Sequence, residues 1–390
     1  MRFGCLPGEI KEALKSKENI WIHAVSVGEV LSVKQLIQNI KKAFPRHQIV
    51  LSTVTKTGYA MATKDKGAAD VVIFAPLDFS FVVRKVLNLI NPKIYIVAET
   101  ELWPNLLTSL NKRNIPIVQV NGRISDKSFQ GYKKIHFFFK KEINRISAFC
   151  MQSETDHERV IELGADSRKA NVVGNIKFDD LPGEGEYRQK CFETEKDTQL
   201  LVAGSTHSGE EEILLKVFKS LLNDFPNLRL VIAPRHVERT EEILKIVAQE
   251  GFDPIRFSDI ENKKFEQGHV IVVDTLGHLK SIYAMATLVF VGKSLTVGGG
   301  HNIIEPACFA KPILIGPFME NFRDIVEIFM SNEAIMQVND QQELLFKLRE
   351  LLRNPEEMKT IGRLAKQVVE ANAGATQKTI NIISKFLKKA

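Results

Sequence analysis

Several features that define common classes of protein are missing from this sequence. Its 390 residues include only four cysteines, Cys5, Cys150, Cys191 and Cys308, which lie far apart in the chain. None belongs to a CxxC pair or to a Cys/His spacing typical of a zinc site. A disulfide-stabilised secreted domain is therefore excluded, and the pattern predicts free, buried thiols in a reducing cytoplasm.

Long apolar segments are also missing. No uninterrupted apolar run approaches the ~20 residues that cross a bilayer. Met1 is followed by Arg2, Phe3 and Gly4, and then by a proline and a glutamate, without the apolar core of a signal peptide. We therefore expect that this chain, as it stands, is not an integral membrane protein.

Three familiar ligand-binding motifs do not occur. No GxGxxG follows the first predicted strand, so a dinucleotide fingerprint is absent. The tripeptide Gly292–Ser294 reads GKS, but position 287 is threonine where a Walker A motif requires glycine. No Asp-x-Asp motif occurs anywhere. These absences argue against a P-loop ATPase, and we expect neither a metal in the reaction nor a bound cofactor.

The chain is long enough for two domains, and its charge is unevenly distributed. Residues 1–180 contain 27 Lys and Arg against 18 Asp and Glu, an excess of nine positive charges. The remaining 210 residues contain 26 against 29, an excess of three negative charges. The amino-terminal half is therefore suited to an anionic partner, which at this level includes nucleic acid, anionic lipid and a phosphorylated substrate.

Short apolar segments alternate with amphipathic ones throughout, which predicts parallel sheets covered by helices on both faces. In the first half, Ile20–Ser26 reads as a buried strand, and the following residues to Phe44 have helical spacing. The polar segment Asp179–Asp197 interrupts the alternation, which then restarts. We predict an α/β fold with an amino-terminal Rossmann-like domain (1–180), a linker (181–197), a second Rossmann-like domain (198–372) and a terminal helix (373–390) that packs back on the first domain.

Polar motifs follow predicted strands, where open α/β sheets bind their ligands. SVGEV closes the first strand and places Glu29 at the start of a helix, where a carboxylate is equally explained by the helix dipole. ETELWPNLL places Glu99 and Glu101 together at another strand end. Paired acids in that position favour a functional role, although Glu101 also fits an ordinary first-turn acid.

The segment Asn121–Arg145 is the most basic of the chain and interleaves lysines with Phe129, Tyr132 and Phe137–Phe139. Such a segment can lie on an anionic membrane with its aromatic rings among the headgroups. The alternative is a helix with a phenylalanine-lined core face and solvated lysines. Nucleic-acid binding lacks any known module.

In the second half, small residues and glycines follow several strands. GSTHSGEEE and APRH end two predicted strands, and both suit an anion, through a helix start and an arginine fork respectively. Lys177 precedes the linker, where it would face an interdomain cleft, although a solvent-exposed lysine is the simpler interpretation. The strongest motif is GGGHNIIE, Gly298–Glu305, whose glycines allow the backbone to approach a ligand closely.

Taken together, these segments resemble the 3-deoxy-D-manno-octulosonic acid (Kdo) transferases of lipopolysaccharide synthesis. WIHAVSVGEV, STVTKTGY, PLD, ETELWPNL, NGRIS, NIKFD, GSTHSGEE, APRH and GGGHNIIEPA occur in the family's order over nearly the whole chain. The resemblance implies a GT-B fold, two Rossmann-like domains whose parallel sheets face each other across a cleft. It also implies CMP-Kdo as the donor and a lipid A precursor as the acceptor.

The resemblance also assigns residues. It implies Glu29 as the proton acceptor, with Glu99 and Lys177 as transition-state stabilisers. It further implies that the following residues contact CMP: Pro234, Arg235, Leu276, Gly277, His278, Asn302, Ile303, Ile304 and Glu305. Glu305, as an acid in that segment, would accept hydrogen bonds from the ribose.

The sequence departs from the family pattern in two places. The family commonly has Gly-Glu where this chain has Gly277-His278, so one acceptor carboxylate is lost. A hydrophobic anchor usually precedes the Arg-Phe-Gly segment and is missing from this chain. The resemblance implies an enzyme at the cytoplasmic face of the inner membrane, on an anionic lipid surface and without a nucleic-acid partner.

Two other functions remain open from the residues alone. One is a GT-B glycosyltransferase that uses another donor, such as a UDP-sugar. The other is a non-catalytic nucleotide-binding protein, although Glu29, Glu99 and Lys177 are three side chains of the types that catalysis needs. The number of Kdo residues added, the acylation of the acceptor and the oligomeric state are not encoded in recognisable motifs.

Overall fold

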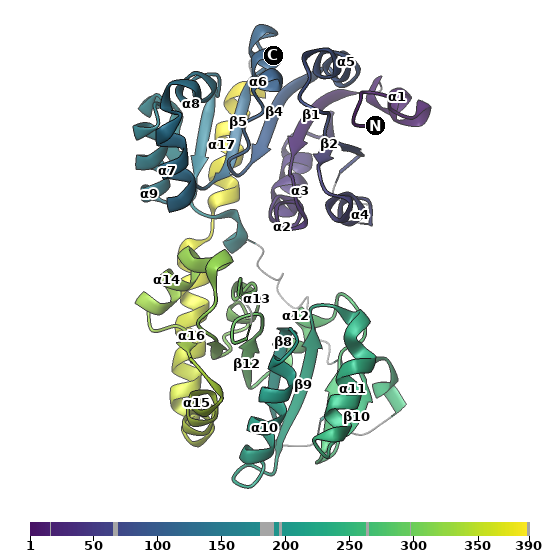
Figure 1. Ribbon diagram of the computed structural model, residues 1–390, viewed down its shortest axis with the longest axis vertical. Coiled ribbons are helices and arrows are strands. Elements are labelled where there is room, and N and C mark those ends of the chain that lie inside the picture. The colour runs from purple at the N-terminus through teal and green to yellow at the C-terminus, as the bar shows by residue number, and fades with distance from the viewer. Residues whose placement is uncertain are drawn as a thin grey trace. The chain divides into compact units, whose positions relative to one another are not determined.

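The computed structural model describes residues 1–15, 17–64, 69–179, 191–194, 197–262, 265–296 and 298–387. It contains two compact units, one formed by Met1–Asp180 with Asn372–Ala390 and the other by Leu181–Ala371 (Figure 1). Most of the predicted linker, 181–190 with 195 and 196, lies outside the described residues. Among the described residues, no helix is long and apolar enough to cross a membrane.

The first unit is built on a seven-stranded parallel sheet with strand order β3-β2-β1-β4-β5-β6-β7. The chain therefore moves outward from β1 in one direction, then returns and continues outward on its other side from β4. The strands are β1 (Glu18–His23), β2 (His47–Thr53), β3 (Val71–Phe74), β4 (Pro92–Ala98), β5 (Ile117–Gly122), β6 (Ala148–Met151) and β7 (Ala170–Val172).

Alternation along the strands fills a core on each face of this sheet. In β1, Trp21 packs with Val82 and other residues of α5, whereas Ile20 and Ile22 pack on the opposite face with Leu36 of α3. The helical elements are α1 (Gly8–Lys15), α2 (Val27–Ser32), α3 (Lys34–Ala43), α4 (Lys56–Lys64), α5 (Ser80–Ile90), α6 (Pro104–Lys112), α7 (Asp126–Lys134), α8 (His136–Ile143), α9 (Glu154–Glu162), η1 (Ser167–Lys169), η2 (Ile176–Asp179) and α17 (Ala375–Leu387).

The predicted single helix after the first strand is wrong in one respect, because the chain forms two helices that meet at Val33. The hydroxyl of Ser32 donates to the carbonyl oxygen of Glu29 at 2.8 Å, and the amide of Val33 donates to the same oxygen. A serine that bonds back to its own helix bends it. The hydrophobic spacing continues across the break, which is why the sequence pattern did not reveal it.

The carboxy-terminal helix α17 packs on the first unit. It contacts α3, η2 and β4, and its Ile380, Ile382 and Ile383 belong to the core beneath α3. The carboxylate of Asp179 accepts hydrogen bonds from the amides of Gly374 and Thr376 at the start of this helix. The last turns of the chain thus complete the hydrophobic face of a sheet whose strands all lie within residues 18–172.

The second unit contains another seven-stranded parallel sheet, with strand order β10-β11-β9-β8-β12-β13-β14. The two strands predicted to end in GSTHSGEEE and APRH are confirmed here, while the short strands at the two edges have no comparable apolar run. The strands are β8 (Gln199–Thr206), β9 (Leu228–Pro234), β10 (Asp253–Arg256), β11 (His269–Val272), β12 (Leu288–Val291), β13 (Ile313–Ile315) and β14 (Met336–Gln337).

Helices cover the second sheet as they do the first. Phe218 of α10 and Leu348 of α15 share one buried core with strand residues such as Phe290. The helical elements are α10 (Glu210–Leu221), η3 (Val237–Arg239), α11 (Thr240–Gln249), η4 (Phe257–Asn262), α12 (Leu279–Met285), α13 (Ile304–Ala307), η5 (Glu320–Phe322), α14 (Arg323–Ser331), α15 (Gln341–Arg353) and α16 (Pro355–Asn372).

The predicted α/β fold with two Rossmann-like parallel sheets is confirmed. All four cysteines are free, as the sequence indicated, and Cys150 and Cys308 are buried. Cys5 is exposed and Cys191 is partly exposed, so the expectation that all the thiols are buried is wrong for these two.

Candidate active site

The order of strands in each sheet identifies where a ligand can bind. In an open parallel sheet, the crevice lies beyond the carboxyl ends of the two strands at which the chain reverses its direction of winding. In the first sheet these strands are β1 and β4, and in the second they are β8 and β12. The motifs containing Glu29 and Glu99 follow β1 and β4, and those containing His207 and Lys293 follow β8 and β12.

Glu29 is held by the turn that joins β1 to α2. Its Oε2 accepts from the amide of Val25 at 2.8 Å, and its Oε1 accepts from the hydroxyl of Ser26 at 3.0 Å. The carboxylate is nevertheless mostly removed from water. Burial raises the pKa of Glu29 to about 7, and the charges of Glu99 and Glu101 add to the increase while the two hydrogen bonds oppose it. Such a carboxyl group exchanges a proton near neutral pH.

Glu99 follows β4 with its backbone in the left-handed region, at φ 54°. This conformation is costly for a non-glycine residue and is maintained by its surroundings. The Nε2 of Gln119 on β5 donates to the carbonyl of Glu99 at 2.7 Å and to the hydroxyl of Thr100 at 3.1 Å. The strand next to β4 therefore fixes the turn that places Glu99 near Glu29.

Glu101 is a third carboxylate at this edge of the sheet. Burial raises its pKa, and the charge of Glu99 contributes further. Glu99 and Glu101 both act on Glu29, and these two acids come from a single motif. Glu101 is therefore a partly buried acid whose charge acts on Glu29, and not an ordinary acid on an exposed helix.

Lys177 lies in η2, which follows the last strand of the same sheet. The amide of Ile176 donates to the Oδ1 of Asn121 at the end of β5, at 3.1 Å, and the amide of Lys177 donates to the Oδ1 of Asn175 at 3.0 Å. Asn121 and Asn175 are both joined to Gln152. This chain of amide side chains ties η2 to the carboxyl end of β5, two strands from β1.

A small pocket beside these acids was not expected from the sequence. It is lined by Trp21, His23, Ala75, Pro76, Asp78, Val83, Trp103 and Leu106. Burial lowers the pKa of His23 to about 4, so this imidazole is neutral at physiological pH, and its Nε2 has no hydrogen-bond partner in the described structure. Only the alternation of β1 could have suggested that His23 faces inward with Trp21.

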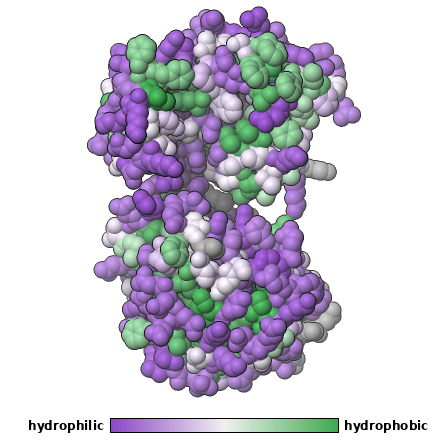
Figure 2. Space-filling model, in the orientation of Figure 1, coloured by the Kyte–Doolittle hydropathy of each residue, from purple (hydrophilic) through white to green (hydrophobic). Residues whose placement is uncertain are grey.

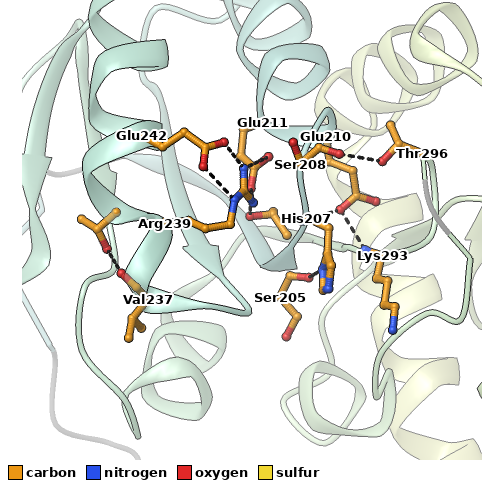
Figure 3. Close-up of polar contacts among 12 residues, drawn as sticks. Ser205, His207, Ser208, Glu210, Glu211, Val237, Arg239, Glu242, Lys293 and Thr296 are labelled. Atoms are coloured by element: carbon orange, nitrogen blue, oxygen red, sulfur yellow. Dashed lines mark hydrogen bonds and ion pairs between the residues drawn. The ribbon is translucent and has the colours of Figure 1, made fainter.

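In the second unit, the turn after β8 is organised by buried carboxylates at the start of α10 (Figure 3). Glu210 and Glu211 are completely buried. Glu211 pairs with Arg239 at 2.9 Å and accepts from the hydroxyl of Thr206 at 2.8 Å, and Arg239 also pairs with Glu242 at 2.7 Å. The sequence predicted an anion-binding turn at GSTHSGEEE, and the structural role of these acids was not foreseen. Three consecutive acids at a helix start were the available signal.

The residues expected to contact CMP lie around the same end of the second sheet. Pro234 is the buried last residue of β9, and the amide of Arg235 donates to the carbonyl of Thr206 at 3.1 Å, leaving an exposed guanidinium. The charge of Arg235 is one cause of the lowered pKa of His301, which places these two side chains near each other.

Two parts of the expected CMP site follow β11 and β12. Leu276, Gly277 and His278 are all exposed, and the ring of His278 lies 5.0 Å from that of Phe257. Ile303 and Ile304 are buried, so their side chains serve the core and cannot contact a ligand.

The amide of Ile304 is bonded to the Oδ1 of Asn302 at 3.1 Å. Glu305 lies in the first turn of α13, and its charge contributes to the raised pKa of Tyr283 on α12, the helix that follows His278. The structure thus places Glu305 beside the helix after the Leu276–His278 corner.

Within the described residues, no group of three or more His, Cys, Asp or Glu side chains is arranged to hold a metal ion.

Comparison with known proteins identifies the family of this chain. A family model described as 3-deoxy-D-manno-octulosonic-acid transferase matches residues 1–180, and one described as glycosyl transferases group 1 matches residues 185–368. A 3-deoxy-D-manno-octulosonic acid transferase of Haemophilus influenzae is 34% identical over 377 residues, covering 95% of this chain and 88% of that protein. The chain belongs to the Kdo transferase family. It is therefore a glycosyltransferase.

Two further relatives define the limits of the likeness. A bifunctional glycosyltransferase/methyltransferase of Fusobacterium nucleatum is 38% identical over 343 residues, and this Kdo transferase chain spans 52% of its length. The UDP-GlcNAc 2-epimerase of Neisseria meningitidis, crystallised with UDP-GlcNAc, superposes with a TM-score of 0.61 over 95% of this chain and all of that one. At 12% identity that second likeness shows the shared GT-B-like fold alone.

Proposed function

We propose that this enzyme transfers Kdo from CMP-Kdo to a primary hydroxyl of a lipid A precursor and releases CMP. Family membership supports the transfer of Kdo, and the resemblance in the motifs supports the donor and the acceptor. The observation that favours this chemistry most directly is the buried carboxylate of Glu29 at the reversal point of the first sheet, with a pKa of about 7. A general base works best when its pKa lies near the operating pH.

Glu29 takes the proton of the acceptor hydroxyl as that oxygen bonds to the anomeric carbon of Kdo. The bond from this carbon to the phosphate oxygen of CMP breaks, and CMP leaves with the electron pair. A single displacement of this kind inverts the anomeric centre, and its transition state resembles an oxocarbenium ion, as in glycoside hydrolysis.

The other residues have complementary roles in this proposal. Glu99 stabilises positive charge on the sugar ring, because a carboxylate favours an oxocarbenium-like transition state. Lys177 and Arg235 stabilise the negative charge that develops on the departing phosphate. Asn302, Glu305 and the Leu276–His278 corner hold the nucleoside, and no step requires a metal ion.

The surface of the first unit has features that support binding to an anionic membrane. Exposed aromatic side chains, Phe137 at 91% and Phe138 at 52%, lie on α8, and Phe79 and Phe81 lie exposed at the start of α5. Figure 2 shows hydrophobic surface over these two regions of the unit. The helices α7 and α8 also contain several lysines, a composition suited to aromatic residues among anionic headgroups. We propose that the enzyme acts there, at the cytoplasmic face of the inner membrane.

The alternative interpretation of the segment Asn121–Arg145 is a helix with a phenylalanine-lined core face. Its buried aromatic residues support that interpretation only in part. Phe139 is buried, and its ring stacks on Tyr132 with centroids 4.0 Å apart, so one face of α8 belongs to the core. Phe137 and Phe138 do not. The core interpretation therefore applies to Phe139, whereas membrane contact is proposed for Phe137 and Phe138.

A product assay tests the proposal. Purified enzyme is given a tetraacylated lipid A precursor with CMP-Kdo in one reaction and with a UDP-hexose in another, and the lipids are analysed by mass spectrometry. We expect a mass increase of one or more Kdo residues with CMP-Kdo and none with the UDP-sugar. Hexose transfer would indicate a different donor. Nucleotide binding without any product would indicate the non-catalytic alternative.

A further inference from the structure

Lys293 has an unusual backbone conformation at the reversal point of the second sheet. It follows β12 between Gly292 and Ser294, and its φ is 57°. Side chains with a Cβ disfavour this left-handed region, which glycine adopts without strain. A lysine at such a position destabilises the fold relative to glycine, which is a reason to look for a use of its side chain.

Glu210 holds the loop in this conformation. Its completely buried carboxylate accepts four backbone amides, from His207 at 2.9 Å, Lys293 at 2.8 Å, Ser294 at 2.9 Å and Leu295 at 3.0 Å. A Cβ at Gly292 would lie 2.7 Å from the Oε2 of Glu210. The carboxylate therefore joins the turn after β8 to the turn after β12, and neither can shift without losing these bonds.

The ammonium of Lys293 extends away from this network. Figure 3 shows its side chain running beside the ring of His207, on the same side of Glu210. Its Cε and Nζ lie 3.3 and 3.4 Å from the point that a Cβ of Gly299 would occupy, so the lysine passes close to the backbone of the glycine segment. No ion pair of Lys293 is recorded in the described parts of the chain.

Further basic side chains surround the same point. The ring of His207 lies 5.2 Å from that of His301 and 5.6 Å from that of His236. Burial lowers the pKa of His301 to about 3, and the nearby charges of Arg235 and Lys293 contribute to the decrease. The Nε2 of His301 is buried without a hydrogen-bond partner in the described structure.

The carboxylates near these basic side chains already accept hydrogen bonds from backbone amides. Glu210 acts on His207, but both of its oxygens are bonded to amides. Glu320, on the far side of the glycines, accepts from the amide of Gly299 at 2.6 Å. Two permanent cations and three imidazoles therefore converge on one place with an orphaned nitrogen among them, which suits a multiply charged oxyanion.

We propose that Lys293 binds the phosphate of the nucleotide donor, with His207, His236 and His301 completing the subsite and Glu210 positioning the lysine. This assignment rests on the proposed function, since it takes the donor to be a nucleotide sugar. It extends the donor site beyond Arg235 and Asn302–Glu305, and it explains why a lysine occupies a position where glycine would be more stable.

The test compares CMP with cytidine by isothermal titration calorimetry, because the two ligands differ only in the phosphate. We expect wild-type enzyme to bind CMP much more tightly than cytidine. In Lys293→Gly and Lys293→Met, CMP binding should weaken roughly 10- to 100-fold, as expected for a hydrogen bond to a charged group, while cytidine binding stays unchanged. Lys293→Gly should also melt at the same temperature as wild type or higher, because it removes the left-handed strain.

A matched control is Glu333→Gly, which relieves another left-handed residue, at φ 53°, at an exposed site after α14. It should leave both affinities unchanged. If the Lys293 variants keep the wild-type preference for CMP, or if they lose CMP and cytidine binding equally, the subsite is wrong. If wild-type enzyme itself does not distinguish CMP from cytidine, the proposed nucleotide donor fails, and the subsite fails with it.

Discussion

The carboxylates of Glu29 and Glu99 come from the turns after two adjacent strands, and Glu99 lies near enough to affect the ionisation of Glu29. The charge of Glu99 is one cause of the raised pKa of Glu29, second to burial among the effects that raise it. The pair straddles β1 and β4, the two strands at which the first sheet reverses its winding. The proposed base therefore has its pKa set by the same crevice that would receive the acceptor.

Replacing Glu29 by glutamine should abolish transfer while leaving the donor site intact. Glutamine keeps the size of the side chain and loses the basic carboxylate, so kcat should fall roughly 100- to 10,000-fold. Calorimetric affinity for CMP should remain that of wild type, because the residues proposed to bind the nucleotide all lie in the second unit. Turnover near the wild-type rate would remove Glu29 from the role of base.

The pH dependence of transfer should follow the same carboxyl group. A base acts only when deprotonated, and the pKa of Glu29 is about 7, so kcat/KM should rise with pH to a plateau above that value and fall about tenfold per unit below it. In Glu99→Gln, the midpoint of the normalised profile should move to lower pH, because a charge that raises the pKa of Glu29 has been removed. An identical midpoint in both enzymes would contradict the electrostatic coupling.

The raised pKa of Glu29 also predicts that replacing this residue by glutamine stabilises the first unit at high pH but not at low pH. The folded pKa of about 7 exceeds the unfolded value of 4.5, so the folded state binds the proton more tightly. Ionisation of the buried carboxyl group therefore destabilises the folded state. This loss of stability is absent below pH 4.5, grows as the pH rises and is complete above 7, where it amounts to roughly 1–3 kcal/mol.

Urea denaturation can measure this effect in the first unit alone. Both tryptophans of the chain, Trp21 and Trp103, lie in that unit, so their fluorescence reports its unfolding. Glu29→Gln should raise the free energy of unfolding at pH 8 and leave it nearly unchanged at pH 4. Equal effects at the two pH values would show that burial of the charge is not the cause.

Removing the charge of Glu210 should loosen the turns that it joins. Glu210→Gln retains one acceptor oxygen but presents an NH₂ group to amides that are themselves donors, so we expect a loss of roughly 1–3 kcal/mol in the second unit. Hydrogen exchange of the Lys293–Leu295 amides should accelerate, and CMP binding should weaken. Glu242→Gln is the control, since its half-exposed ion pair with Arg239 is worth about 1 kcal/mol or less.

Membrane binding should depend on the exposed phenylalanines of α8. Phe137→Ser with Phe138→Ser should reduce co-sedimentation with anionic liposomes, and binding by wild-type enzyme should weaken as salt is added. Phe346→Ser provides the control, because Phe346 is 60% exposed on α15 of the other unit. Loss of liposome binding in the control variant would contradict the proposed role of Phe137 and Phe138. Binding that does not depend on salt or on lipid charge would also contradict it.

Chelation should leave the transfer reaction intact. The sequence has no Asp-x-Asp motif, and no step of the proposed mechanism uses a metal ion. We expect full activity after dialysis against EDTA. A complete loss that magnesium restores would show that the departing CMP needs a cation in addition to the lysine and arginine side chains.

Local structure followed closely from the sequence. Ile20, Trp21 and Ile22 predicted a buried strand because a strand covered on both faces must be apolar throughout. Pro104 is the first residue of α6, where its missing amide removes no helical bond. The break at Val33 did not follow, since a single hydroxyl from Ser32 decides it and leaves the hydrophobic period unchanged.

The site followed from the sequence only in outline. The motifs marked strand ends, but the order of strands decides which of those ends are neighbours. Glu29 and Glu99 are separated by two strands along the chain, β2 and β3, yet they flank adjacent strands in the sheet. Spacing in sequence contains no such information, because hydrogen-bond pairing between distant segments sets the order.

By itself, the sequence determined the alternation of strands and helices, the resemblance to the Kdo transferases and the kinds of side chain at each strand end. Only the tertiary structure decided what those side chains do. Burial gave Glu29 a pKa near neutrality, and it turned Glu210 from a helix-start acid into the anchor of two turns. The physical reason is the same in both cases, because the properties of a carboxylate depend on the water and the amides around it, which are fixed only when distant segments meet.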